Sequence, residues 1–223
     1  MTVSMENDKT VAAYCAVSDR YITNEITIAD QDSAAAQRKR DELQDFMEEA
    51  FGPLGKGARI FEIGSGPCEG AVLLRDKLGF NVTPSDVNAQ GFREEIEAHG
   101  FKWREFHAVY DDLPDVYDGF FFWRVFQHFT PDDAKIVLEK VYNGLRPGGR
   151  VLFSTMNHEG HEEDFEVVDF SGVYKIGRKR YFRYWWESDL NALVGHMGFR
   201  IVHFFKYGGS GQYKKWLVYI LEK

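Results

Sequence analysis

Short apolar runs alternate with amphipathic stretches along most of this chain, starting at residue 58. The run at 58–63 (ARIFEI) is followed directly by glycines, which is typical of a buried parallel strand. The same pattern predicts further strands at 81–86, 101–108, 118–125, 150–156, 199–206 and 213–221, and helices at 67–79, 89–99, 131–145 and 187–195. This alternation predicts an α/β fold with a doubly wound, Rossmann-like, mostly parallel sheet of seven strands. A short glycine turn at 208–211 makes the last strand antiparallel to the strand before it.

Residues 10–51 carry a helical pattern, after nine residues that look frayed. Apolar side chains recur there three to four residues apart, as at Leu43, Phe46, Met47 and Phe51. Gly52 and Pro53 would end this helix. We therefore expect an N-terminal helical cap at 1–54 and a main domain at 55–223, with a less regular insertion at 157–186 that forms a substrate lid.

Composition and charge narrow the class of protein. The chain is 44% apolar, and its formal net charge of −8 disfavours binding to nucleic acid or to an anionic membrane surface. Cys15 and Cys68 give neither a disulfide framework nor a metal-ligand spacing. The sequence lacks an apolar run of the ~20 residues that a membrane span needs, and its N-terminus lacks the apolar stretch of a signal peptide. We expect a cytoplasmic monomer or homodimer that binds no membrane.

The loop after the first predicted strand has the pattern G-x-G-x-x-x-G, formed by Gly64, Gly66 and Gly70. Glycine tolerates positive φ and lets the backbone approach a ligand closely. Asp86 stands twenty residues beyond Gly66, at the end of the next predicted strand, where an acid in such folds reaches a ribose. Glu62 precedes the loop, and a carboxylate there suits a ligand with ammonium and sulfonium groups better than a pyrophosphate.

A purely structural interpretation of these residues is also open. The glycines could make only a tight turn, Glu62 could pair with Arg59 or Lys56, and Asp86 could cap a helix. The order of strand, loop, helix, strand and acid favours the ligand site.

Several segments resemble the class I S-adenosylmethionine (SAM)-dependent methyltransferases. RIFEIGSGPCEG looks like their glycine-rich first motif, and PSDVN looks like the acidic end of their second strand. YDGFFFWRVFQHF is similar to their fourth-strand segment, and LRPGGRVLFST resembles the entrance to their fifth strand. RYWWESDL followed by HMGF is similar to a segment common in members that act on small molecules. The resemblance covers residues 55–223.

The resemblance implies a cofactor site built from loops and strand ends. Its members would be Glu62, Gly64, Ser65 and Gly66 at the methionine part of SAM, Asp86 at the ribose hydroxyls, Val87 at the adenine, and Trp123 and Arg124 beneath the methionine moiety. The acid that many members place after their third strand falls here at Val109. Asp111 and Asp112 are the nearby acids, and we expect Asp111 to meet the adenine amine.

Methyl transfer from a sulfonium is an in-line displacement, so positioning of the reactants supplies most of the catalysis. His128, just past the fourth predicted strand, is the best candidate for a general base, because the ordinary pKa of histidine lies near neutrality. Alternatively, His128 binds backbone where the next helix starts. Arg124 would hold the SAM carboxylate or an anionic substrate, or else pair with a surface acid.

Two polar stretches follow the fifth predicted strand. His158 and His161 lie in an acidic segment, but a glycine between them favours a solvated loop, and we expect no metal. The segment 174–186 interleaves basic and aromatic residues, which suggests a lid over an anionic small molecule, with Tyr184 and Trp185 as substrate contacts. A solvated hairpin or an RNA contact would fit the pattern of this segment as well.

The N-terminal cap holds Tyr14 and Tyr21. Cap helices in the resembling family fold over the cofactor, so these tyrosines would close the substrate pocket. Equally, they would only pack the cap onto the sheet.

The sequence thus predicts a methyltransferase that moves a methyl group from SAM to an O or N atom of a small molecule. An NAD-dependent oxidoreductase would share the fold, but it needs G-x-G-x-x-G, and Glu69 stands at the third glycine. The same residues would also suit a SAM-binding protein without catalysis or an RNA methyltransferase.

Overall fold

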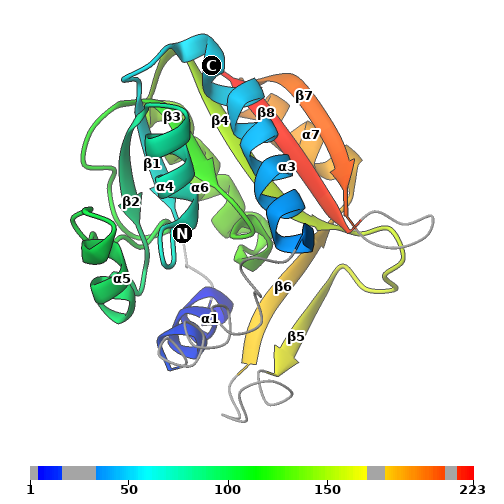
Figure 1. The fold of residues 1–223 in the computed structure, drawn as a ribbon. Helices are drawn as coiled ribbons and strands as arrows, with labels where there is room; N and C mark the ends of the chain where they lie inside the picture. The colour runs from blue at the N-terminus through cyan, green and yellow to red at the C-terminus, as the bar shows by residue number, and fades with distance from the viewer. Residues whose placement is uncertain (1–4, 17–33, 170–178, 209–214) are drawn as a thin grey trace.

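The computed structural model describes residues 5–16, 34–169, 179–208 and 215–223. Within these ranges an eight-stranded sheet forms the centre of the molecule (Figure 1). β1 (Arg59–Ile63) lies between β2 (Asn81–Ser85) and β3 (Tyr117–Phe122), β3 pairs with β4 (Leu145–Asn157), and all four are parallel. β8 (Trp216–Glu222) runs antiparallel between β4 and β7 (Arg200–Tyr207). The prediction of a mostly parallel sheet with an antiparallel last strand is confirmed.

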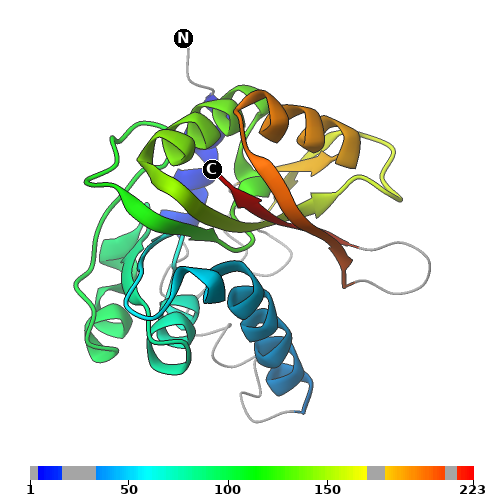
Figure 2. The ribbon, with the colours of Figure 1, turned by 90° about the horizontal axis from the view of Figure 1, so that it is seen from above.

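Helices cover both faces of the sheet (Figure 2). One face carries α3 (Ala34–Phe51), α4 (Glu69–Val72) with the helical turn that continues it (Leu73–Lys77), a short turn (Ala89–Phe92) and α5 (Arg93–Ala98). The other face carries the turn Phe126–His128, α6 (Pro131–Gly144) and α7 (Glu187–His196). α1 (Met5–Cys15) lies apart from both layers, and a turn at Gly52–Leu54 ends α3. None of the helices in the described ranges is long and apolar enough to cross a membrane.

The side chains of β3 show why both faces need cover. Phe120 and Phe122 belong to the core on the α6 and α7 side, whereas Phe121 belongs to the core under α3 and α4. Successive side chains of a strand point to opposite faces, so an uninterrupted apolar strand requires two cores.

The sequence also explains where α6 begins. Thr130 caps this helix by accepting a hydrogen bond from the N–H of Asp133 at 3.3 Å.

The predicted strand at 101–108 is wrong. This segment makes a single parallel bridge, between Asp86 and Glu105, through hydrogen bonds of Asp86 N to Arg104 O and of Phe106 N to Asp86 O. Polar side chains at Lys102, Arg104 and Glu105 are exposed at this edge of the sheet, so only a short contact forms. The bridge places this segment beside the end of β2.

The segment 157–186 is more regular than the sequence suggests. It contains β5 (Phe165–Asp169) and β6 (Lys179–Trp185), which pair antiparallel, and the end of β6 also pairs in parallel with the end of β4. The sheet therefore has eight strands where seven were predicted. The proline–glycine–glycine stretch at 147–149 lies inside β4, where the pairing with β3 is irregular.

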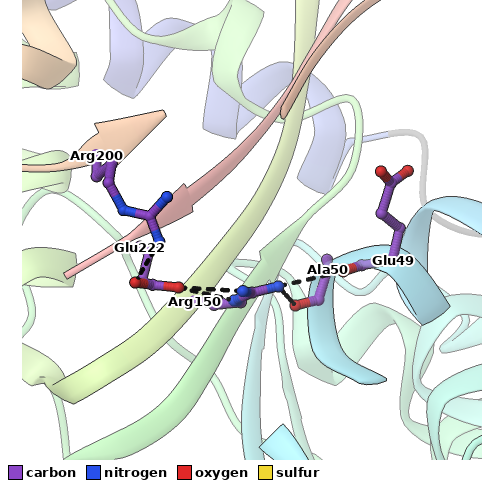
Figure 3. Close-up of polar contacts among 5 residues, drawn as sticks. All are labelled: Glu49, Ala50, Arg150, Arg200 and Glu222. Atoms are coloured by element: carbon purple, nitrogen blue, oxygen red, sulfur yellow. Dashed lines mark hydrogen bonds and ion pairs between the residues drawn. The ribbon is translucent and has the colours of Figure 1, made fainter. Parts of the chain in front are cut away.

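Arg150 on β4 joins three elements (Figure 3). Its guanidinium donates to the backbone oxygens of Glu49 and Ala50, each at 3.3 Å, near the end of α3. It also donates to Glu222 on β8, at 3.2 Å from Nε and 3.1 Å from Nη2. The last carbonyls of a helix lack partners within the helix and carry partial negative charge, so a cation there stabilises the helix end. Arg200 binds the other oxygen of Glu222 at 2.6 Å.

We expect Arg150→Leu to lower the free energy of unfolding by about 1.5–3 kcal/mol, because several charge-assisted hydrogen bonds of a largely buried side chain are lost. Arg200→Gln is the matched control. Arg200 is 64% exposed and meets the same carboxylate, so its loss should change stability by less than about 1 kcal/mol. Urea denaturation measures both, and equal effects would contradict the role given to Arg150.

Candidate functional site

The carboxyl ends of β1, β2 and β3 open into a cavity of about 300 Å³. The chain runs from β1 to β2 on one side and then returns to place β3 on the other side of β1. Such a reversal leaves a crevice at the carboxyl ends of the strands, where ligands bind in open α/β sheets. Most of the residues predicted for cofactor and substrate line this cavity: Tyr14, Glu62, Gly64, Ser65, Gly66, Asp86, Val87, Trp123, Arg124 and His128.

The glycine loop is shaped by its neighbours. Gly64 has a φ of +71°, and a Cβ there would overlap the side chain of Val125. A Cβ on Gly70 would overlap the carboxylate of Glu62. The loop is tied to the end of β2 by hydrogen bonds from Ser65 N to Ser85 O and from Gly66 N to Asp86 Oδ2, both at 2.9 Å. The first and third glycines are therefore required by packing.

Glu62 is a buried carboxylate at the floor of the cavity, only 4% exposed. Its Oε2 atom has no hydrogen-bond partner among the residues that the structure describes. Burial, reinforced by the charge of Asp86, holds the pKa of Glu62 well above its ordinary value. A carboxylate that is buried away from water destabilises the folded protein unless a cation or a hydrogen-bond donor contacts it. The site therefore favours a ligand that supplies such a group.

Asp86 follows β2 and faces the same cavity. Its carboxylate accepts hydrogen bonds from Gly66 N and from Asn88 N, the latter at 2.8 Å. Burial raises the pKa of Asp86, while these two N–H groups hold it down. Val87, which follows Asp86, also lines the cavity.

Asp111 and Asp112, the acids predicted near the adenine, lie outside the cavity and are exposed. The carboxylate of Asp111 closes a local turn by accepting from His107 N at 2.7 Å. The residues of this segment that line the cavity are Phe106, His107 and Ala108. The segment predicted to meet the adenine thus reaches the cavity through these three residues, and its two predicted acids do not.

The segment after β3 turns sharply at Arg124, whose φ is +59°. Arg124 N donates to Ser154 Oγ at 2.9 Å, the amide of Gln127 donates to Arg124 O, and the guanidinium lies 5.0 Å from the ring centre of Trp216. A residue other than glycine in this region is strained, and such strain gathers at ligand sites. Trp123 lines the cavity and packs against Phe46 of α3.

His128 lies where the segment after β3 meets α1 and β6. Nδ1 is 2.9 Å from Tyr181 O, and Nε2 is 2.9 Å from the hydroxyl of Tyr14. A carbonyl only accepts, so Nδ1 carries the proton and Nε2 accepts from Tyr14. Burial lowers the pKa of His128 to about 4, against the bond to Tyr181 O and with the help of the nearby Arg180. The imidazole is therefore neutral around pH 7.

Tyr184 and Trp185 do not line the cavity. Tyr184 donates to Glu166 and stacks on His161 with ring centres 3.5 Å apart. Trp185 is buried in the core against Phe126. Both side chains are buried against other parts of the protein and away from the cavity. Their position in the sequence did not indicate this. Tyr21 and residues 174–178 lie outside the described residues.

His158 and His161 are engaged in protein contacts. His158 Nε2 is 3.1 Å from Asp164 Oδ1, and its ring stacks on Trp186 with centres 4.0 Å apart. Over the part of the chain that the structure describes, no three His, Cys, Asp or Glu side chains come together as a metal site.

α1 supplies three cavity residues that sequence reasoning missed, Asn7, Thr10 and Val11, and it also carries Tyr14, which the sequence predicted. Asn7, Thr10, Val11 and Tyr14 line the cavity together. Their spacing of three, one and three residues is that of one helix face, so a signal existed in the sequence. The sequence around α1 did not indicate which part of the fold this helix face would contact.

The sequence of this chain matches a known protein family. A family model described as "Methyltransferase domain" matches residues 35–204. No curated protein sequence matches the chain.

Solved structures share the fold at low identity. A SAM-dependent methyltransferase from Clostridium acetobutylicum is 14% identical, with a TM-score of 0.70 over 93% of this chain and 98% of its own. The 1,6-didemethyltoxoflavin-N1-methyltransferase of Burkholderia thailandensis, solved with 1,6-didemethyltoxoflavin and S-adenosylhomocysteine, is 19% identical, with a TM-score of 0.67 over 100% of this chain and 92% of its own. A DhpI-SAM-HEP complex is 17% identical, with a TM-score of 0.68 over 100% of both chains.

We expect Glu62→Gln to raise the free energy of unfolding of the ligand-free protein by about 1–3 kcal/mol at pH 8, because the wild type must either bury a charge or keep this carboxyl protonated in solution where a free glutamate ionises. The folded-state pKa of Glu62 is raised, so wild-type stability falls as pH rises from the unfolded-state pKa through the folded-state pKa. Below about pH 4 the carboxyl is protonated in both states, and the two proteins should converge.

Glu69→Gln is the matched control for this measurement. Glu69 is an exposed carboxylate of the same loop, and its loss should change stability by no more than about 0.5 kcal/mol at either pH. Urea denaturation at pH 8 and pH 4 gives all the values needed. A Glu62→Gln protein that is less stable than wild type at pH 8 would refute the account of this carboxylate.

Proposed function

This chain belongs to the methyltransferase domain family, and we propose that it transfers a methyl group from SAM to an O or N atom of a small-molecule acceptor. The observation that carries the choice of donor is Glu62, an acid that lines the cavity and whose buried Oε2 has no hydrogen-bond partner among the described residues. The α-ammonium group of SAM is a cation that would satisfy it. A dinucleotide, which presents pyrophosphate, would add repulsion at this carboxylate.

The other residues fit the same donor. Asp86 would accept hydrogen bonds from the ribose hydroxyls, with Val87 beside the adenine. Gly64, Ser65 and Gly66 would follow the methionine part, above Trp123 and Arg124. His107, with a buried Nε2 and no partner for it in the described residues, would lie near the adenine in place of the expected acid.

When bound, SAM supplies an electrophilic methyl group, so the chemical step is an in-line displacement at carbon. The main task of the chain is to orient the two reactants, which can contribute about 7–11 kcal/mol to lowering the barrier. α1 covers the cavity and helps to keep water from it. His128, which lines the same cavity, would receive the proton that the acceptor loses, and this adds about 10²–10⁴-fold.

The size of the cavity supports a small acceptor. It lies between the strand ends and α1, and its volume of about 300 Å³ is at the lower end of the range for small-molecule sites. This volume must take SAM as well, which leaves little room for a large acceptor. The small-molecule methyltransferase from Burkholderia thailandensis shares this fold. A base at His128 would suit an O or N acceptor, because both kinds of nucleophile can carry a proton to be removed.

Calorimetry with SAM, S-adenosylhomocysteine and NAD tests the donor. We expect SAM and S-adenosylhomocysteine to bind and NAD not to bind, because only the first two compounds present an ammonium group to Glu62. Binding of NAD without binding of SAM or its product would overturn the proposal.

Asp86→Ala should weaken SAM binding by about tenfold to a hundredfold, the equivalent of the hydrogen bonds that a charged group makes to the ribose. Asp112→Ala is the control, since Asp112 is exposed and lies outside the cavity. The same calorimetry measures both variants. Unchanged affinity of Asp86→Ala would remove Asp86 from the site.

A further inference from the structure

Three side chains from distant parts of the sequence form one directed chain of hydrogen bonds at the edge of the cavity. Arg180 Nη1 donates to the hydroxyl oxygen of Tyr14 at 2.9 Å, and that hydroxyl donates to His128 Nε2 at 2.9 Å. His128 Nδ1 in turn donates to Tyr181 O at 2.9 Å. Every direction is fixed by chemistry, because a guanidinium only donates and a carbonyl only accepts.

Both ring nitrogens of His128 are therefore occupied. The amide nitrogen of Gln127, 3.3 Å from Nε2, is a second donor facing the same lone pair. An acceptor molecule cannot hand its proton directly to Nε2 unless it displaces the hydroxyl of Tyr14. Tyr14 itself lines the cavity, as His128 does.

The position of Tyr14 is set by backbone contacts of β6. Thr10 Oγ1 accepts from Tyr181 N at 2.8 Å, and Tyr181 O accepts from His128. Thr10 and Tyr14 are four residues apart on α1 and share one face of the helix. A single residue of β6 thus fixes both the helix that carries Tyr14 and the imidazole that Tyr14 binds (Figure 1 shows α1 beside β6).

We propose that Tyr14 is a catalytic residue that takes the proton of the acceptor and passes its own proton to His128, and that the acceptor class is therefore a neutral compound with a dissociable O–H or N–H, such as a phenol or a heteroaromatic N–H. This inference rests on the proposed function. The new bond joins the methyl carbon to the acceptor O or N, and the electron pair of the methyl–sulfur bond stays on sulfur. The acceptor proton moves to Tyr14 Oη while the Tyr14 proton moves to His128 Nε2. The imidazolium then releases one proton to water, which restores the starting state.

The surroundings support each half of this transfer. The guanidinium of Arg180 stabilises negative charge that develops on the oxygen of Tyr14 during the exchange. The carbonyl of Tyr181 accepts from Nδ1, which stabilises positive charge on the ring. An acceptor that is already deprotonated, or a tertiary amine, would make no use of this arrangement.

The relay can be tested on the whole chain without any ligand. In ¹⁵N-histidine NMR, with His128 assigned through His128→Gln, we expect the neutral tautomer protonated at Nδ1 at pH 7. Tyr14→Phe keeps the ring and removes the hydroxyl, so the Nε2 resonance should shift as its hydrogen bond is lost. A tautomer protonated at Nε2, or an Nε2 resonance unmoved by Tyr14→Phe, would overturn the proposal.

Tyr110→Phe is the matched control for this spectrum. The hydroxyl of Tyr110 also tethers α1, by donating to Asp8 Oδ1 at 2.5 Å, but Tyr110 does not line the cavity. Its removal should leave the His128 resonances in place. If Tyr110→Phe moves them as far as Tyr14→Phe does, the effect comes from displacement of α1, and the relay is refuted.

Turnover supplies the second test, with formation of S-adenosylhomocysteine as the measurement. The probes are 4-methylphenol, which must lose a proton, and N,N-dimethyl-4-methylaniline, which has none to lose. Tyr14→Phe should lower kcat for the phenol by about 10²–10⁴-fold and leave kcat for the amine unchanged. Equal losses with both probes would show that Tyr14 has only a structural role.

The two tests separate the relay from the proposed function. If neither probe is methylated, the NMR result alone decides on the relay. If SAM fails to bind in calorimetry, the proposed function fails, whereas the His128 resonances still report whether the hydrogen-bonded chain exists.

Discussion

The parallel pairing of β1 with β2 on one side and β3 on the other is the constraint on which the site depends. It buries both faces of β1, with Ile60 in one core and Phe61 in the other. It also leaves the carboxyl end of β1 without a crossover helix above it, which opens the cavity. Glu62 is the exception within this buried strand. It lines the cavity, where the proposed cationic ligand would meet it, so this buried acid is the residue of the strand that carries the proposed function.

The acceptor end of the cavity depends on a different kind of contact. α1 belongs to neither helical layer, and it is held through polar contacts such as Thr10 Oγ1 with Tyr181 N and Tyr110 with Asp8. Elements held by few apolar contacts are the ones that open most easily in native proteins. A cover built in this way can admit a ligand while the sheet, with its two buried cores, stays intact. The division suits a protein that must release a product after each turnover.

The sequence could bring together the residues proposed for the cofactor because they are local. Glu62, Gly66 and Asp86 lie within one strand–loop–helix–strand unit, where periodicity and glycine spacing fix both the elements and their order. The acceptor end is not local, since Tyr14, His128 and Arg180 meet only in the folded chain. The predicted strand at 101–108 failed because its polar residues left it a single bridge at the sheet edge. Tyr184 and Trp185 were misplaced because the partners of β6, and so the direction of each side chain, are set by tertiary pairing.

The low pKa of His128 bears on how the acceptor end can work. A pKa of about 4 makes the imidazole a weak base, but it also keeps Nε2 unprotonated at neutral pH and ready to accept from Tyr14. Weak basicity is tolerable because the leaving group in this reaction is already activated, so proton removal need only assist the displacement. The arrangement also conserves charge. A neutral acceptor that becomes a neutral product sends one positive charge to His128 as the positive charge on sulfur is lost. The net charge of a largely buried site is therefore the same before and after the transfer, and the low polarity that depresses the pKa of His128 opposes the chemical step less than it opposes protonation of the resting protein.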